Sequence, residues 1–297
     1  MQVPFTKMNS QGNDFVVIDN TGLLYQFDNK KIRSICSRDI IGCDQLLLLN
    51  IKDSNNVTCE IFNQDGSSAK QCGNGMRAIM LFLNRKYNFF DSKIFVNLVP
   101  YNVSFVNEKE IKVSMGNAVF LENIPNGAPE NISINTKNYY YEVSVNSGIR
   151  PWSFSYSHLS IGNSHCIVFS KGSFDDKEKI SSILNSLYDY SVNISFILNI
   201  EDFIKEPDSS IILRVNERGA GWTKSCGSGA TATGAFISRF MLLPENGSKK
   251  ISELNISQEG GELKIQNIFM TDLDGNYSPE LYLSGPSTFE YDGVWND

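Results

Sequence analysis

Two cysteines stand at matching positions in the chain, and their surroundings favour acid–base chemistry. Cys72 begins the run Cys-Gly-Asn-Gly, and Cys226 begins the run Cys-Gly-Ser-Gly. An apolar run follows each of them, which predicts a buried helix that begins just after each cysteine. A helix N-terminus offers free backbone N–H groups and the positive end of the helix dipole. Such a site binds an anion, most simply a substrate carboxylate, and it lowers the pKa of a cysteine placed there.

Two such sites acting on one carbon would invert its configuration. One cysteine would remove a proton as a thiolate, and the other would return a proton to the opposite face as a thiol. Oriented N–H groups would stabilise the carbanion, and the glycines would let the backbone approach it closely. The sequence has no Gly-x-x-x-x-Gly-Lys run and no Gly-x-Gly-x-x-Gly after a strand. We therefore expect cofactor-free stereoinversion next to a carboxylate.

Composition excludes several classes of function. The chain has 297 residues, 41% hydrophobic and 20% charged, which is typical of a folded protein long enough for two domains. A net charge of −7 without a basic cluster argues against nucleic acid and membrane surfaces as partners. No signal peptide or membrane span is expected. Six cysteines without Cys-x-x-Cys spacing indicate no metal site and a reducing, cytoplasmic compartment.

Hydrophobic patterns predict many strands and four helices. Asp28 is a good N-cap for a helix through about residue 37, with Ile32, Ile35 and Cys36 on one face. The helices behind the two cysteines are expected to end near residues 85–87 and 243. An amphipathic helix is expected over residues 175–190. Residues 124–129, rich in proline, glycine and asparagine, are the best candidate for a linker.

Two landmarks recur in the same order, which predicts an internal duplication. Gly12-Asn13 returns as Gly162-Asn163, 150 residues later, and Cys72 returns as Cys226, 154 residues later. We therefore expect an α+β fold of two pseudo-symmetric lobes, each a β-rich sheet or barrel wrapped around a central helix. The expected lobes are residues 1–120 with 276–297, and residues 121–275. Pseudo-symmetry would bring both cysteines to an active site in the cleft between the lobes.

Several motifs together resemble diaminopimelate epimerases over most of the chain. Residues 8–15, Met-Asn-Ser-Gln-Gly-Asn-Asp-Phe, resemble the opening motif of that family. Residues 63–67, Asn-Gln-Asp-Gly-Ser, and 72–77, Cys-Gly-Asn-Gly-Met-Arg, resemble its first cysteine motif. Residues 162–165, Gly-Asn-Ser-His, match a third motif. The most specific likeness lies at residues 217–229, Glu-Arg-Gly-Ala-Gly-Trp-Thr-Lys-Ser-Cys-Gly-Ser-Gly, which resembles the second cysteine motif.

The resemblance implies a cofactor-independent epimerase that interconverts LL- and meso-2,6-diaminopimelate, on the route to lysine and peptidoglycan. Cys72 and Cys226 would be the acid/base pair, and His165 and Glu217 would contact the ammonium group at the reacting centre. The carboxylate there would be held by residues at the two helix starts: Gly73, Asn74, Gly227 and Ser228. The remaining substrate-binding residues, several at the distal end, would be Asn13, Gln45, Asn63, Asn163, Asn193 and Arg218. The resemblance also implies a homodimer.

The chain departs from the family pattern at three places. Ser164 stands where the family usually has proline, and the match around Asn193 is weaker than elsewhere. Residues 97–100, Asn-Leu-Val-Pro, lack the usual Thr-x-Ala-Gly. None of these departures touches the cysteines.

Three other functions are weighed against this one. Proline and hydroxyproline racemases tend to carry histidine after the first Cys-Gly, where this chain has Asn74. Phenazine-biosynthesis-like isomerases lack the cysteine pair. A thiol-redox protein would work through a reversible Cys72–Cys226 disulfide, whereas oxidation would inactivate an epimerase. His158, which carries no motif, is expected to be structural, as are the remaining cysteines: Cys36, Cys43, Cys59 and Cys166.

Overall fold

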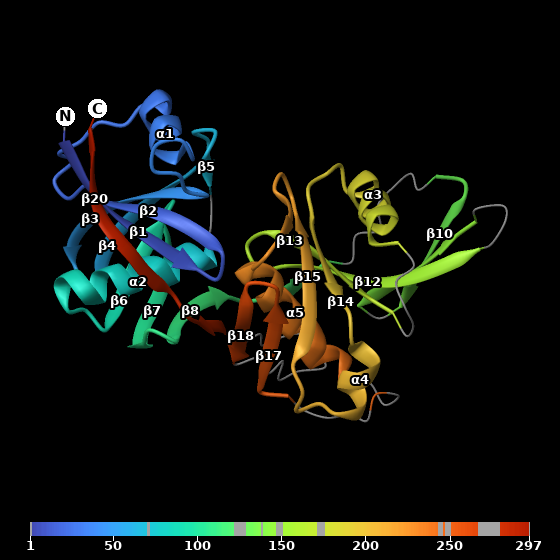
Figure 1. Ribbon diagram of the computed structural model, residues 1–297. Helices are drawn as coiled ribbons and strands as arrows, with labels where there is room; N and C mark the ends of the chain where they lie inside the picture. Colours follow the sequence, from blue (N-terminus) through green and yellow to red (C-terminus); the bar gives the residue numbers. More distant parts are fainter. Residues whose placement is uncertain are drawn as a thin grey trace. The chain divides into compact units, whose positions relative to one another are not determined.

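A computed structural model describes residues 2–69, 72–121, 129–137, 139–146, 151–170, 176–242, 246, 251–266 and 280–296. The chain forms two compact units (Figure 1). The first unit is Met1–Ser114 with Leu283–Asp297, and the second is Met115–Tyr282. The expected linker at residues 124–129 lies outside the described residues except for Pro129, and so do the expected lobe boundary at residues 275–276 and the expected helix end at residue 243.

The first unit holds two helices and most of the N-terminal strands. Its helices are α1 (Asn29–Cys36) and α2 (Gly73–Tyr87). Its strands are β1 (Gln2–Ser10), β2 (Asn13–Asp19), β3 (Gln45–Asp53), β4 (Asn56–Asn63), β5 (Ser68–Ala69), β6 (Asp91–Val96), β7 (Val99–Asn107) and β20 (Thr288–Asn296). Two strands lie across the unit boundaries in the sequence, β8 (Glu110–Gly116) and β19 (Leu281–Gly285).

The described residues of the second unit form three helices. These are α3 (Lys177–Leu187), α4 (Ile200–Lys205) and α5 (Gly227–Phe240). Its strands are β9 (Val119–Phe120), β10 (Ile132–Lys137), β11 (Tyr140–Val145), β12 (Trp152–Ser160), β13 (Ser164–Phe169), β14 (Asn193–Ile197), β15 (Ile211–Glu217), β16 (Gly221–Thr223), β17 (Glu253–Gln258) and β18 (Gly261–Gln266).

The two units repeat one strand topology. In the first, pairing runs β20-β1-β2-β3-β4-β6-β7, with β2–β3 and β4–β6 parallel and the other pairs antiparallel. In the second, pairing runs β11-β12-β13-β14-β15-β17-β18, with β13–β14 and β15–β17 parallel and the rest antiparallel. Short strands β5 and β16 pair with β4 and β15 at corresponding places. The predicted duplicated α+β fold is thus confirmed.

Each unit encloses one helix. α2 packs against β1, β2, β6, β7 and β20, and α5 packs against β12, β13, β14, β17 and β18. In each unit the helix contacts strands near both ends of the pairing order given above. The sheet therefore curls around its helix. α2 is buried from Gly73 through Leu83, and α5 is buried at nearly every position. This agrees with apolar sequences that show no single hydrophobic face.

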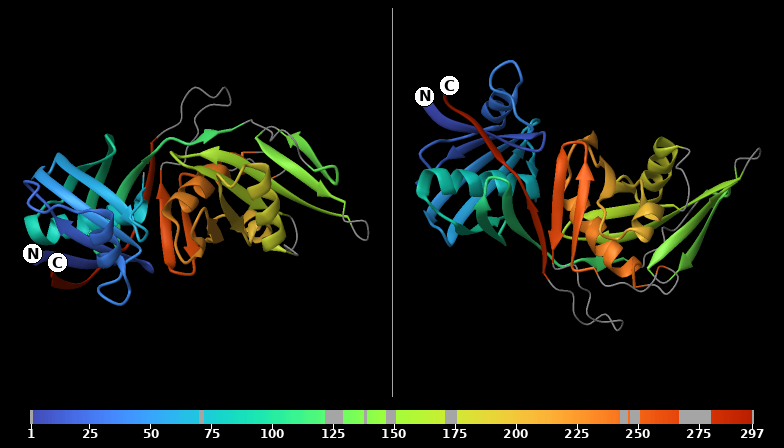
Figure 2. Two further views of the ribbon diagram at one scale, coloured as in Figure 1. Left: turned by 90° about the horizontal axis from the view of Figure 1, so that it is seen from above. Right: turned by 60° about the horizontal axis from the view of Figure 1, so that its bottom comes forward.

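The two ends of the described chain belong to the same unit. β1 and β20 run side by side in every view (Figures 1 and 2), and Gln2 lies opposite Asn296 in their antiparallel register. The first unit is therefore completed by the last strand of the sequence. The second unit is inserted between β8 and β19 in the chain.

Local signals in the sequence account for the helix ends. Asp28 caps α1 by accepting the Lys31 N–H at 2.9 Å, and the buried residues of this helix are Ile32, Ile35 and Cys36, as predicted. α3 is shorter than expected, because Asp176 caps its start and the helix ends at Leu187. The carbonyl of Leu184 still accepts the Tyr188 N–H, after which the backbone turns away from helical geometry.

Candidate active site

The sulfur of Cys72 caps α2. Cys72 has extended backbone angles (φ −154°, ψ 98°), and its Sγ accepts the Gly75 N–H at 3.2 Å. Serine, threonine and aspartate are the usual N-cap residues. Here the N-cap is a cysteine, and its sulfur therefore lies at the positive end of the helix dipole. A Cβ on Gly75 would lie 3.4 Å from this sulfur, which is an ordinary van der Waals contact.

Cys226 caps α5 in the same way. Its backbone is extended (φ −123°, ψ 106°), and its Sγ accepts the Gly229 N–H at 3.3 Å. A Cβ on Gly229 would meet the Ser195 Oγ at 3.0 Å and the Cys226 Sγ at 3.3 Å. The match between the two Cys-Gly-x-Gly runs is therefore a match in capping geometry.

Burial of Cys226 changes the expected electrostatics. The residue is 3% exposed, whereas Cys72 is half-buried. Burial raises the pKa of the Cys226 thiol well above its usual value, and the neighbouring Glu217 carboxylate raises it further. The expected lowering by the helix N-terminus is wrong for Cys226 in this structure, because loss of hydration outweighs the Gly229 N–H and the Ser228 hydroxyl. Burial therefore favours the thiol form of Cys226 in this structure.

Gln258 fixes the backbone of Cys226. Its side-chain Oε1 accepts the Cys226 N–H at 2.8 Å, and its Nε2 donates to the Cys226 carbonyl at 3.2 Å. Gln258 ends β17, one of the strands around α5. The sequence gives no local signal for this role, because Gln258 lies 32 residues beyond the cysteine.

A polar cluster surrounds the start of α5. The Ser228 hydroxyl lies 3.4 Å from the Cys226 Sγ and 3.1 Å from the His165 Nε2. The Asn163 Nδ2 donates to the same hydroxyl at 3.3 Å, and the Asn163 Oδ1 lies 3.2 Å from the His165 Nε2. Burial lowers the pKa of His165 to about 3, so its imidazole is neutral at physiological pH. Three of the expected site residues are therefore in contact beside the cysteine.

Glu217 and Asn193 complete this cluster. Burial raises the pKa of Glu217, although the Thr223 hydroxyl donates to its Oε1 at 2.5 Å and opposes the shift. The Asn193 Oδ1 accepts the Arg218 N–H at 3.0 Å. Asn193 lies opposite His165 in the parallel β13–β14 register, so the weak sequence match still falls on the site.

The expected residues of the first unit share a sheet edge. β2 starts at Asn13 and β3 starts at Gln45, and these strands are parallel, with Phe15 opposite Gln45. Gln45 also lies opposite Asn63, at the end of antiparallel β4, and its Nε2 donates to the Asn63 Oδ1 at 3.0 Å. The Gln45 Oε1 is buried without a hydrogen-bond partner among the described residues.

The α2 N-terminus is joined to this edge. The Ser10 hydroxyl donates to the Asn74 carbonyl at 3.0 Å, and Ser10 pairs with Asn13 across the β1–β2 hairpin. The fully buried Arg77 donates to the Asn74 Oδ1 at 2.7 Å and to the Gln11 Oε1 at 2.9 Å. Arg77 lies in the first cysteine motif, but its role as the support of Asn74 emerges only from these contacts.

The other expected structural residues are buried. Cys36, Cys43, Cys59 and Cys166 are buried free thiols, and the His158 Nε2 lies 2.7 Å from the Ser164 Oγ. Within the described ranges, no group of three or more His, Cys, Asp or Glu side chains could hold a metal ion. The helices of the described segments are all too short or too polar to cross a bilayer.

Comparisons with known proteins point to one family. A family model described as diaminopimelate epimerase matches residues 5–121. The chain is 32% identical to a diaminopimelate epimerase of Coxiella burnetii (strain Dugway 5J108-111) over 100% of both chains. It is also 32% identical to the diaminopimelate epimerase of Blochmanniella floridana, over 98% of this chain and 99% of the relative.

Solved structures share the fold at low identity. A phenazine biosynthesis protein of the PhzF family from Bacillus anthracis matches 100% of both chains with a TM-score of 0.65 and 13% identity. A hydroxyproline epimerase from Agrobacterium vitis matches 99% of this chain and 91% of its own, with a TM-score of 0.63 and 10% identity. The architecture of two β-rich units is therefore common to these proteins.

Proposed function

Because the chain belongs to the diaminopimelate epimerase family and is an epimerase, we propose that Cys72 and Cys226 are the acid/base pair that interconverts LL- and meso-diaminopimelate. One sulfur takes the α-proton as a thiolate, and the other donates its own proton to the opposite face of the α-carbon. The thiolate and thiol exchange roles in the reverse direction. The observation that carries this proposal is the pair of sulfur-capped helices, one in each unit of the repeat.

Backbone N–H groups at the two helix starts supply the electrostatic stabilisation. The first N–H groups of a helix lack intrahelical acceptors, so they can bind the substrate carboxylate and stabilise negative charge that develops beside it. The groups that serve in this way belong to Gly73, Asn74, Gly227 and Ser228. The contact of Ser228 with both Cys226 and His165 supports its place at the reacting centre.

Neutral and anionic groups then fix the amino-acid end that reacts. His165 is neutral, so it does not repel the substrate ammonium, and Glu217 attracts the ammonium when it is ionised. The distal end of diaminopimelate is a second amino acid, and a guanidinium such as Arg218 can bind its carboxylate bidentately. The other residues proposed to bind substrate are amides at the strand ends: Asn13, Gln45, Asn63, Asn163 and Asn193.

Deuterium incorporation tests the proposed reaction. LL-diaminopimelate is incubated with the protein in deuterated water, and the product is analysed by NMR and chiral chromatography. Deuterium at one α-carbon together with the meso isomer is expected. Absence of both the label and the meso isomer would remove diaminopimelate as substrate.

A redox test separates this function from a thiol-redox protein. Oxidation of Cys72 and Cys226 to a disulfide, or of either one to a mixed disulfide, removes the thiol and thiolate pair. Activity should therefore fall on oxidation and return with dithiothreitol. A protein that keeps its turnover after both thiols are blocked with iodoacetamide contradicts the proposal.

We also propose a cytoplasmic homodimer. The six free thiols support a reducing compartment, and sedimentation equilibrium tests the dimer.

A further inference from the structure

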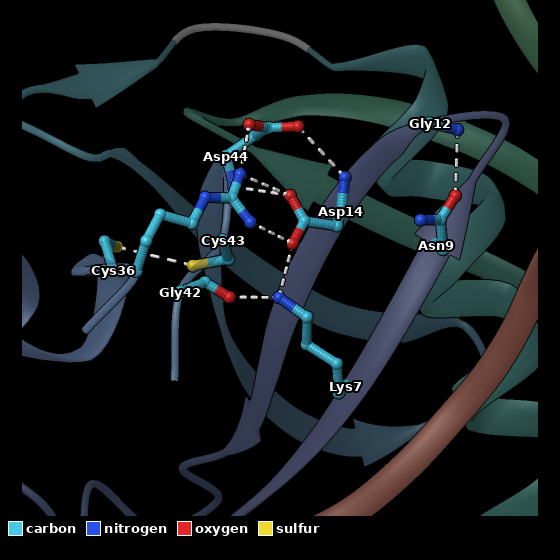
Figure 3. Close-up of polar contacts among 9 residues, drawn as sticks. Lys7, Asn9, Gly12, Asp14, Cys36, Gly42, Cys43 and Asp44 are labelled. Atoms are coloured by element: carbon cyan, nitrogen blue, oxygen red, sulfur yellow. Dashed lines mark hydrogen bonds and ion pairs between the residues drawn. The ribbon is translucent and has the colours of Figure 1, made fainter. Parts of the chain in front are cut away.

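Four charged side chains of the first unit form one network of hydrogen bonds and ion pairs (Figure 3). Arg38 donates to both oxygens of Asp14, with Nη1 at 2.5 Å and Nη2 at 2.8 Å. Its Nη2 also donates to the Asp44 Oδ1 at 2.7 Å. Lys7 donates to the Asp14 Oδ2 and to the Gly42 carbonyl. The two cations and two carboxylates partner one another.

The network joins the starts of two parallel strands. The Asp14 N–H donates to the Asp44 Oδ2 at 3.1 Å, and the Asp44 N–H lies 3.0 Å from the Asp14 Oδ1 and 2.9 Å from the Asp14 carbonyl. Asp14 directly follows Asn13, and Asp44 directly precedes Gln45. The Asp14–Asp44 contact therefore joins the sequence neighbours of Asn13 and Gln45, whose side-chain amides are proposed to bind substrate.

Burial makes this contact depend on its cations. Asp14 is 9% exposed and Lys7 is 5% exposed. Burial raises the pKa of Asp14, but hydrogen bonds from Arg38 and Lys7 outweigh it and lower the pKa to about 2. A buried carboxylate that loses such a partner keeps its desolvation penalty without compensation.

Local backbone geometry also supports Arg38. Gly42 has a φ of +77°, and a Cβ there would lie 2.8 Å from the Arg38 Cδ and 3.0 Å from its Cα. The backbone at Gly42 therefore packs closely against Arg38, and the Gly42 carbonyl accepts a hydrogen bond from Lys7. Behind this turn, the Cys43 and Cys36 sulfurs lie 3.5 Å apart (Figure 3).

We infer that Arg38 is a positioning residue, which clamps Asp14 to Asp44 and so holds Asn13 and Gln45 at the spacing that binds substrate. This inference rests on the proposed function of those two amides. Arg38 does not act as a substrate ligand itself, because its guanidinium is engaged with the two carboxylates.

Substitution of Arg38 tests the clamp in the full-length protein. Arg38→Met should raise KM for diaminopimelate about tenfold, because the side-chain amides of Asn13 and Gln45 lose their spacing. Its kcat should stay within about threefold of wild type. Arg38→Lys, which keeps the charge without the bidentate fork, should fall between. Arg85→Met is the matched control, since Arg85 is similarly exposed and forms an ion pair with Glu108 in the same unit.

Two further measurements make the result decisive. Millimolar guanidinium should restore KM of Arg38→Ala and leave Arg85→Ala unchanged, because the Arg38 side chain is 55% exposed and its site can admit the small cation. Amide hydrogen exchange at Asp14 and Asp44 should accelerate in Arg38→Met but not in Arg85→Met. This exchange needs no substrate, so it reports on the clamp even if wild type fails to epimerise diaminopimelate.

Several outcomes would overturn the inference. Unchanged hydrogen exchange at the Asp14 and Asp44 backbone N–H groups would show that Arg38 does not hold the starts of β2 and β3 together. Faster exchange with an unchanged KM would make the clamp purely structural. A fall in kcat at constant KM would place Arg38 in the chemical step. Inactive wild-type protein would instead refute the proposed function.

Discussion

Substituting Cys226 by alanine and by serine separates the chemical role of its sulfur from its capping role. Alanine removes both roles, because the Gly229 N–H loses its acceptor. Serine keeps an acceptor at the cap, but an alcohol is far too weak an acid to supply the thiol proton or a thiolate base. Both variants should therefore lose activity, while only the alanine variant should lose stability.

The size of each effect follows from the structure. Loss of a cap costs about 1 kcal/mol, and a neutral sulfur acceptor at 3.3 Å belongs at the lower end of the range. The site is 3% exposed, so the vacated volume adds up to about 1 kcal/mol. At roughly 2–4 °C per kcal/mol, Cys226→Ala should melt about 5 °C below wild type, and Cys226→Ser within about 2 °C of it. Loss of the acid/base group should lower kcat by about 10³-fold or more in both.

Circular dichroism melting and the deuterium assay measure these two quantities. A serine variant that retains turnover within about tenfold of wild type would refute the acid/base assignment of Cys226. An alanine variant that melts together with the serine variant would refute the capping role of the sulfur. Both results can be obtained on the same protein samples.

Two other predictions concern the site glycines and the buried histidines. Gly229→Ala should lower kcat about 10- to 100-fold, because its Cβ would lie 3.3 Å from the Cys226 sulfur and closer still to other side chains; Gly75→Ala, whose nearest contacts are 3.4 Å or more, should cost less. Equal losses in steady-state assays of the two variants would contradict this reasoning. Burial lowers the pKa of His165 to about 3 and that of His158 to about 4, so the unfolded state binds more protons below about pH 6.5. The free energy of unfolding should therefore rise with pH between about 4 and 6.5, and His165→Gln should reduce this slope in urea titrations; an unchanged slope would mean that His165 is not buried in its neutral form.

Sequence patterns are most informative where a local signal decides the structure. Asp28 and the two cysteines are capping residues with apolar runs behind them, and each helix begins at the expected place. The recurrence of Gly12-Asn13 at Gly162-Asn163 likewise marks the turns of two corresponding hairpins, β1–β2 and β12–β13. Short-range hydrogen bonds and turn geometry are encoded within a few residues, so the sequence is sufficient to find them.

Structure that depends on distant partners escapes this reasoning. Asp292 and Gly293 interrupt the hydrophobic pattern of β20, which becomes a strand by pairing with β1 at the other end of the sequence. The short helix α4 has no side-chain cap bond and was missed as well. The cysteine pKa was predicted from the helix end alone, whereas burial by the surrounding fold decides it for Cys226.

Positioning residues show the same limit. Arg38 and Gln258 carry no motif of their own, and their roles follow from contacts with Asp14 and with the backbone of Cys226. Several candidate site residues lie at strand ends, where the register places Gln45 opposite Asn63 and His165 opposite Asn193. That register is a property of the sheet and not of any single segment.

The pairing of β1 with β20 constrains the order in which the protein can be completed during synthesis. Residues 1–114 of the first unit emerge from the ribosome early, yet β20 can pair with β1 only after residues 288–296 follow. Strands β9 to β18 of the second unit all precede β20 in the sequence. Joining Gln2 to Asn296 through a short peptide and opening the chain elsewhere would produce a circular permutant in which this strand pair becomes a hairpin and folds locally.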